Sequence, residues 1–186
     1  TSTEPRRRRR PPASRTADRN RLFVAPTQSG MSTIRVVRGV GHAETRMASY
    51  DAALAAANIH NYNLVPVSSV IPADATVEEV GTAPDLGPAG ARLTVVEARA
   101  TTGGAGSVSA GLGWATGPGP GLFYEVAGED PDAVRRRVEA GLDAGRELRE
   151  WTFDKESIAV VTTDADSGGY TTAVTVAAYG DADPIL

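Results

Sequence analysis

Clusters of glycine and proline divide this chain into short apolar segments, and this division constrains the fold more than any other feature. The clusters lie at 81–90, 103–106 and 117–121, where they predict turns. The apolar segments have the patterns of strands. They lie at 34–40, 63–71, 76–80, 91–100, 106–116, 121–127, 156–163 and 170–179. We expect the first strand to end at Gly39 or Gly41.

One alanine-rich segment has helical rather than strand-like spacing. Apolar residues recur there at helical intervals, which predicts a helix over 46–58 with one buried stripe. The members of this stripe are Met47, Tyr50, Leu54 and Ala57.

A second helix is predicted to begin at Asp130. Aspartate is a favoured N-cap, and Pro131 suits the first helical position. The apolar stripe of this helix consists of Val134, Val138 and Leu142. Many strands with two interspersed helices predict a layered α+β domain in which helices cover one face of each sheet.

Charge is distributed unevenly along the chain. Residues 1–30 carry eight arginines against two acidic residues, whereas residues 31–186 carry eleven basic and twenty-one acidic residues. A polar, like-charged segment that contains proline buries too little surface to offset its ordering entropy. We therefore predict a disordered Arg-rich extension over 1–30 and a single folded domain over 31–186. A tether to nucleic acid is the less favoured interpretation of the extension.

Several chemistries are excluded or disfavoured by composition. The absence of cysteine excludes disulfides, thiolate-ligated zinc and thiol catalysis. Pyridoxal phosphate would have to use Lys155, the single lysine, which lies just outside a predicted strand. We therefore expect neither a metal nor pyridoxal phosphate. The chain has no apolar run of bilayer length and no secretion signal at its start, so we expect a cytoplasmic protein without a membrane partner.

Two adjacent serines, Ser68 and Ser69, lie inside the apolar segment 63–71, where a hydroxyl has little packing reason to be. If the backbone strains their peptide bond, the Ser69 hydroxyl can attack the preceding carbonyl carbon and convert the amide to an ester. Elimination then frees two chains, and the resulting dehydroalanine hydrolyses to a pyruvoyl group. This reaction needs a donor to the developing oxyanion, for which Asn63 is a candidate. From these residues alone, two hydrogen-bonded serines in a strand are the favoured interpretation.

Asp51 is a candidate binding residue, because it lies at the edge of the predicted helical stripe. A carboxylate in such a place is costly unless a cation pairs with it. Either an internal arginine such as Arg46 or Arg99 or the guanidinium of a substrate would serve, and the residues favour neither.

Glu125 is a candidate general acid. It lies in the strand predicted over 121–127, whose other side chains are apolar on both faces. Burial there would raise its pKa and keep the carboxyl group protonated. The alternative is a glutamate that reaches solvent at the end of the strand.

The sequence Asn63-Leu-Val-Pro-Val-Ser68-Ser69-Val-Ile-Pro72 resembles the cleavage segment of the pyruvoyl-dependent arginine decarboxylases. Three further stretches carry the resemblance, which covers 39–180. They are Ala-Ser-Tyr-Asp51-Ala-Ala-Leu, Gly121-Leu-Phe-Tyr-Glu125, and the passage from Trp151-Thr-Phe-Asp154 through Ser157-Ile-Ala-Val160 to the closing strand at Tyr179. The chain departs from the family in having one proline after the serines and bulky residues at 60–62.

The resemblance implies a four-layer αββα sandwich of the pyruvoyl-dependent decarboxylase type, assembled as a homotrimer with sites between neighbouring subunits. It also implies self-cleavage between Ser68 and Ser69. The products would be a β chain over 1–68 and an α chain over 69–186, whose first residue becomes a covalent pyruvoyl group.

The implied activity is that of a carboxy-lyase (an arginine decarboxylase), which converts L-arginine to agmatine and CO2 through a Schiff base, as a step in arginine metabolism and polyamine biosynthesis. The resemblance assigns Asn63 to processing, Glu125 to proton donation, and Asp51 with the backbone around Met47 to the guanidinium end of the substrate. Ser68 is expected to contact substrate as well. Lysine or ornithine is the alternative substrate, and a non-catalytic oligomer with a nucleic-acid-binding tail is the less favoured alternative function.

Overall fold

Two β-sheets and two helices make up the computed structural model, which describes residues 32–165 and 167–186. Within these residues the elements are β1 (Thr33–Ala43), α1 (Arg46–Ala56), β2 (Asn63–Pro66), β3 (Val70–Ile71), β4 (Thr76–Gly81), β5 (Arg92–Gly103), β6 (Gly106–Thr116), β7 (Gly121–Gly128), α2 (Pro131–Glu147), β8 (Lys155–Ala165) and β9 (Tyr170–Tyr179). The predicted mixed α+β class is confirmed. The predicted extension over 1–30 lies outside the described residues.

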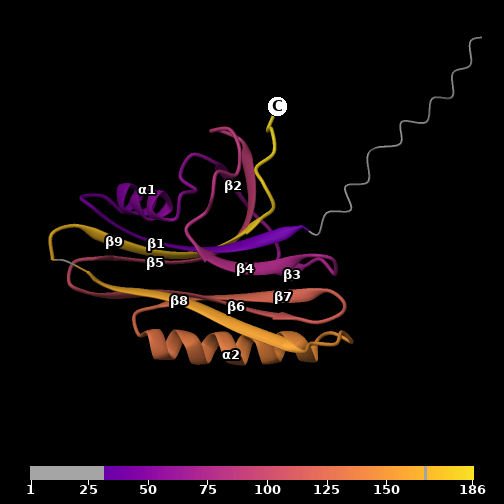
Figure 1. Cartoon of the computed structure of the whole chain (residues 1–186). Coiled ribbons are helices and arrows are strands. Elements are labelled where there is room, and N and C mark those ends of the chain that lie inside the picture. Colours follow the sequence, from indigo (N-terminus) through magenta and orange to yellow (C-terminus); the bar gives the residue numbers. More distant parts are fainter. Residues whose placement is uncertain (1–31, 166) are drawn as a thin grey trace, which may run out of the picture. The chain divides into compact units, whose positions relative to one another are not determined.

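The first sheet has the strand order β2-β5-β9-β1-β4, and the second has the order β3-β7-β6-β8. In the first sheet the central strand β9 is antiparallel to both neighbours, whereas β2 and β4 join the edges in parallel. All pairs in the second sheet are antiparallel. Figure 1 shows α1 against the first sheet and α2 against the second.

The inner faces of the two sheets contribute side chains to one shared apolar core. Its buried members are Ile34, Val36, Val96 and Ala177 from the first sheet and Ile71, Leu112, Trp114, Phe123 and Ala159 from the second. A second core lies between α1 and the first sheet, and a third lies between α2 and the second sheet. Each sheet therefore has one face against the other sheet and one against a helix.

Helix α1 buries the predicted stripe residues Leu54 and Ala57, but it does not bury the whole predicted stripe. Its buried residues are Ser49, Ala53 and Leu54, whereas Met47 is 69% exposed and Tyr50 is only half-buried. The predicted stripe is therefore wrong at Met47. The buried face is made mostly of small residues because the helix lies unusually close to the strand beneath it.

Two glycines in β1 make this close approach possible. A Cβ atom at Gly39 would lie 1.9 Å from the Ala53 carbonyl oxygen, and one at Gly41 would lie 2.3 Å from the Ser49 carbonyl oxygen. The prediction that the strand ends at these glycines is wrong, since β1 continues to Ala43. Their role is to leave space for the helix backbone.

Helix α2 follows its prediction. The Asp130 carboxylate accepts a hydrogen bond from the Asp132 backbone N–H at 2.9 Å, which caps the helix ahead of Pro131. The predicted stripe residues Val134, Val138 and Leu142 are all buried against the second sheet.

The single strand predicted over 63–71 is wrong in a way that matters for the site. The segment forms two short strands in different sheets, because β2 pairs with β5 and β3 pairs with β7. Pro66 is the last residue of β2, and the Val67 N–H that follows it still donates to the Val95 carbonyl of β5. The chain therefore crosses from one sheet to the other at residues 67–69, and the Ser68–Ser69 bond lies in this crossing.

The glycine contacts lead to a stability prediction. We expect Gly39→Ala to lower the free energy of unfolding by about 1–3 kcal/mol or more, because the added methyl group forces α1 off the sheet. In a chain of this size each kcal/mol lowers the thermal midpoint by about 2–4 °C. The matched control is Gly119→Ala, where a Cβ meets nothing within 4 Å. Equal midpoints for the two variants in differential scanning calorimetry would contradict this account of α1 packing.

Candidate active site

The structure brings Ser69 and Glu125 into direct contact, although 56 positions separate them. The Ser69 hydroxyl donates to both oxygens of the Glu125 carboxylate, at 2.9 Å and 3.1 Å. Ser69 lies in the crossing between the sheets, and Glu125 is on β7, the strand that pairs with β3. The carboxylate is therefore placed to take or return a proton at residue 69.

Backbone groups hold the serine segment on both sides of the Ser68–Ser69 bond. The Val67 N–H donates to the Val95 carbonyl of the first sheet at 3.0 Å, and the Phe123 N–H donates to the Ser69 carbonyl at 2.9 Å. The Ser68–Ser69 bond is therefore held between two sheets, and their shared core sets the positions of these sheets relative to each other.

A cavity of about 450 Å³ adjoins Ser69 and Glu125. Its walls come from residues 68–70, from β7 and from the C-terminal part of α2, and they include Leu122, Gly145, Leu148 and Arg149. Arg149 is held by a 2.6 Å hydrogen bond to the Gly145 carbonyl. Glu125 and Arg149 bring opposite charges to a pocket whose other walls are largely apolar.

Glu125 is exposed rather than buried, so the expectation of burial on both faces of its strand is wrong for this chain. The reason is the shortness of β3. Its two residues pair with Leu122 and Gly121, so β7 has a free edge beyond them, and Glu125 lies on that edge. The alternative of a glutamate that reaches solvent describes the chain better.

Tyr179 is a site residue that the sequence did not single out for chemistry. Its hydroxyl donates to the Val70 carbonyl at 2.9 Å, and its ring packs edge-on against Phe123 at 6.1 Å between centroids. Burial raises the pKa of Tyr179 to about 12, and the nearby Glu125 carboxylate adds to this effect. A tyrosine that ends a strand has no sequence signal that distinguishes it from a packing residue.

The remaining predicted residues lie apart from this pocket. Asp51 and Met47 are exposed on α1, which lies on the outer side of the first sheet, away from β3 and β7 (Figure 1). The Asn63 side-chain amide donates to the Gly90 carbonyl at 2.6 Å and not to either serine. The ion pairs among the described residues do not include Asp51, so the alternative of a structural pair with Arg46 or Arg99 is not observed. The predicted roles of these residues stay predictions.

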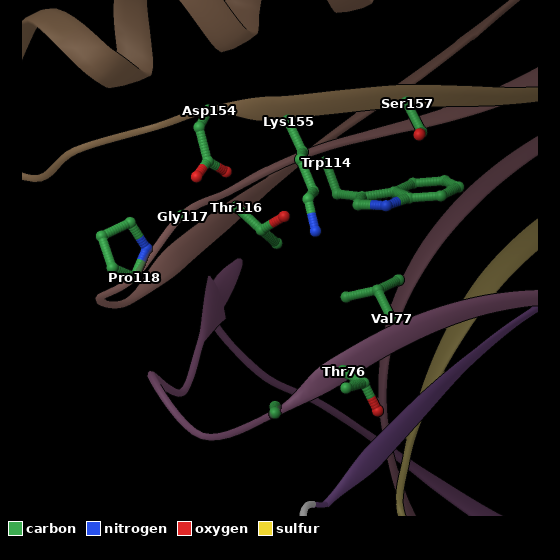
Figure 2. A pocket seen from close by; sticks show the side chains of 10 residues that line it. Thr76, Val77, Trp114, Thr116, Gly117, Pro118, Asp154, Lys155 and Ser157 are labelled. Carbon is green, nitrogen blue, oxygen red and sulfur yellow. The ribbon is translucent and has the colours of Figure 1, made fainter.

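A second cavity, of about 500 Å³, opens between β4 and β8. Figure 2 shows the Lys155 side chain extending from β8 toward Val77 of β4, beside Thr116 and Trp114. None of the predicted site residues lines this cavity. Within the described part of the chain, no three His, Asp or Glu side chains gather closely enough to hold a metal ion. No described helix has the length and apolarity that crossing a bilayer requires.

The two tyrosines with raised pKa values give a pH prediction. Burial also raises the pKa of Tyr50 to about 12, with a further contribution from Glu97. A tyrosine phenol ordinarily has a pKa of 10.0, so the folded state holds these two protons more tightly than the unfolded state does. Their contribution to stability is complete below pH 10.0 and is lost as the pH rises toward 12.

Spectrophotometric titration of tyrosinate should therefore show late ionisation of Tyr50 and Tyr179, near pH 12 or upon unfolding. Tyr50→Phe and Tyr179→Phe should each remove one late proton. A titration in which either variant retains both late protons would refute the assignment.

The chain is similar in sequence to known proteins. A family model described as "Pyruvoyl-dependent arginine decarboxylase (PvlArgDC)" matches residues 33–184. Relatives named pyruvoyl-dependent arginine decarboxylase in two strains of Halobacterium salinarum are 59% identical over 158 residues, which is 84% of this chain and 99% of theirs. A Pyrococcus horikoshii protein of the same name is 38% identical over 125 residues, or 62% of this chain and 78% of its own.

The matched region contains the crossing between the sheets and every residue of the Ser69 pocket. Matches of this extent show that the chain belongs to the pyruvoyl-dependent arginine decarboxylase family.

Proposed function

We propose that this chain is a self-processing carboxy-lyase that converts L-arginine to agmatine and CO2. The observation that carries the proposal is the contact between the Ser69 hydroxyl and the Glu125 carboxylate, at a crossing between the two sheets that adjoins a cavity. Membership of the family supports arginine over lysine or ornithine.

The residues around position 69 fit a pyruvoyl group formed there. The residue-69 carbonyl oxygen already accepts a hydrogen bond from the Phe123 N–H at 2.9 Å, and the side-chain position faces Glu125 and the cavity. Such a group supplies an electrophilic carbonyl for the substrate amine and an adjacent carbonyl that accepts the electron pair released with CO2.

Self-cleavage would use residues of the chain alone. The Ser69 hydroxyl attacks the Ser68 carbonyl carbon, and the Ser68–Ser69 amide becomes an ester. Elimination breaks the ester bond and leaves a carboxylate on Ser68 and dehydroalanine at position 69. Addition of one water with loss of ammonia completes the pyruvoyl group. The chain would then consist of a β chain ending at Ser68 and an α chain beginning at residue 69.

Glu125 would serve as the proton carrier of the pocket. Its two oxygens lie about 3 Å from the residue-69 side chain, within the reach expected of a general acid or base. The apolar walls provided by residues such as Leu122 and Leu148 would limit access of water to the reacting atoms.

The guanidinium group of arginine needs an anionic partner in the site. Glu125 is the one carboxylate among the residues that line this pocket. Arg149 brings a positive charge to the wall, which suits the substrate carboxylate and would repel its guanidinium group. Asp51 is exposed and lies away from the pocket in its own chain. We therefore infer that Asp51 and Met47 of a neighbouring subunit complete the site.

This arrangement supports a homotrimer of four-layer αββα subunits with active sites between neighbours. Asn63 is also exposed and belongs to β2 at an edge of the first sheet, so we assign its role in processing to this interface as well. Arginine would be the small-molecule partner, and a cytoplasmic location and a place in polyamine synthesis remain predictions.

Substitution of the attacking hydroxyl tests self-cleavage. We expect Ser69→Ala to migrate as one intact chain on a denaturing gel and to lack decarboxylase activity, because no nucleophile is left. Ser68→Ala is the matched control, since Ser68 contributes only its backbone carbonyl to the reaction, and it should still yield two chains. Cleavage of the Ser69→Ala variant would rule out the proposed reaction.

Mixing of subunits tests whether the site is shared. Asp51→Ala should raise the KM for arginine strongly, and Glu125→Gln should lower kcat, since each removes a different half of one site. A wild-type site needs an intact Asp51 from one subunit and an intact Glu125 from its neighbour. Co-expression of the two variants in equal amounts should therefore restore roughly a quarter of the wild-type sites in random trimers. Assays of the purified mixture that find no gain over either variant alone would place all site residues in one subunit.

A further inference from the structure

The carbonyl group that Ser69 would attack already accepts a hydrogen bond from within its own turn. The Val70 N–H donates to the Ser68 carbonyl oxygen at 2.8 Å, which closes a three-residue γ-turn around Ser69. Among the described residues Asn58 is the one non-glycine residue with positive φ, so the turn at Ser69 is of the unstrained inverse type. This N–H points back at the bond to be broken.

This donor lies where the reaction develops charge. When the Ser69 hydroxyl adds to the Ser68 carbonyl carbon, the carbonyl oxygen becomes an oxyanion. Hydrogen-bond donors that already point at such an oxygen before the reaction contribute more to the reaction rate than most other groups do. The Asn63 amide of the same chain is occupied by the Gly90 carbonyl, so the Val70 N–H is the donor that this chain itself provides.

Few other contacts hold Val70 in place. Strand β3 has only two residues, the Val70 side chain is 40% exposed, and its N–H faces Ser68 rather than β7. Among the described side chains, Tyr179 alone hydrogen-bonds to the backbone of residues 68–72, through the Val70 carbonyl at 2.9 Å. Tyr179 belongs to the central strand of the first sheet and reaches across to the second, so it is a rigid anchor for this turn.

We propose that Tyr179 is a positioning residue for self-cleavage: its hydroxyl holds the Val70 carbonyl and so fixes residue 70 with its N–H directed at the oxyanion on Ser68. The inference rests on the proposed self-processing of the chain. The step it concerns is the formation of the bond between Ser69 Oγ and the Ser68 carbonyl carbon. The hydroxyl proton leaves to a base, the oxyanion collapses, and the bond from that carbon to the Ser69 nitrogen breaks as the nitrogen gains a proton.

Tyr179→Phe tests this role while retaining the ring and its packing on Phe123. We expect the precursor to cleave roughly tenfold more slowly, a smaller loss than the ~10²–10³-fold cost of deleting a direct oxyanion donor. The readout is the appearance of the two chains on a denaturing gel after synthesis of the precursor. Tyr170→Phe is the matched control, since it removes the same atom at the other end of β9, and it should cleave like the wild type.

Hydroxylamine shows whether Tyr179→Phe slows the formation of the ester or a later step, because it cleaves esters and leaves amides intact. Our proposal places the defect before the ester, so hydroxylamine should not speed cleavage of Tyr179→Phe. Faster cleavage with hydroxylamine, which leaves a hydroxamate on Ser68, would overturn the proposal, because the ester would then have formed normally. Cleavage of Tyr179→Phe at the wild-type rate would overturn it as well.

Val70→Pro provides a second variant that removes the N–H itself. Proline is tolerated at the first residue of a strand, and this N–H makes no bond to β7. We expect cleavage to slow by roughly 10²–10³-fold. An unchanged cleavage rate would refute the role of the Val70 N–H as oxyanion donor, even if Tyr179→Phe does not fold. Wild-type protein that never cleaves would instead refute the proposed function, so the two failures are distinguishable.

Discussion

The passage of the chain from one sheet to the other at residues 67–69 is the constraint on which the site depends. The Val67 N–H is bound to the first sheet and the Ser69 carbonyl to the second, so the Ser68–Ser69 bond is held from two sides by separate frameworks. The shared core sets the distance between these frameworks, and closely packed cores resist adjustment. The geometry of one peptide bond is thereby coupled to the packing of the whole domain.

Backbone and side-chain groups divide the chemical tasks around this bond. Backbone N–H groups of Val70 and Phe123 donate to the carbonyl oxygens of Ser68 and Ser69, and such donors need little reorganisation during a reaction. The Glu125 carboxylate and the Tyr179 hydroxyl come from different sheets and meet the same segment. A small number of groups can therefore support both the making of an electrophile and its later use, since both reactions develop charge next to residue 69.

The sequence predicts most elements within a few residues, and the errors have identifiable physical causes. Helix α2 is predictable because its cap and its stripe are local features. Gly39 and Gly41 resemble the end of a strand, because only the position of α1 shows that they leave space for a helix. The predicted stripe of α1 is wrong at Met47, because only the position of α1 on the sheet shows which of its residues are buried. Burial of Glu125 is wrong because a two-residue β3 leaves β7 with a free edge.

Local patterns of apolar, turn-forming and capping residues were sufficient for the α+β class, for the order of the elements and for the two serines as an unusual feature. They were sufficient because each depends on residues a few positions apart. The contacts that bring Ser69 to Glu125 and Val70 to Tyr179 span 56 and 109 positions, and no local pattern encodes them. Only the packing of two sheets against each other decided that these groups meet, because their separation in space is set by the shared core and not by their spacing along the chain.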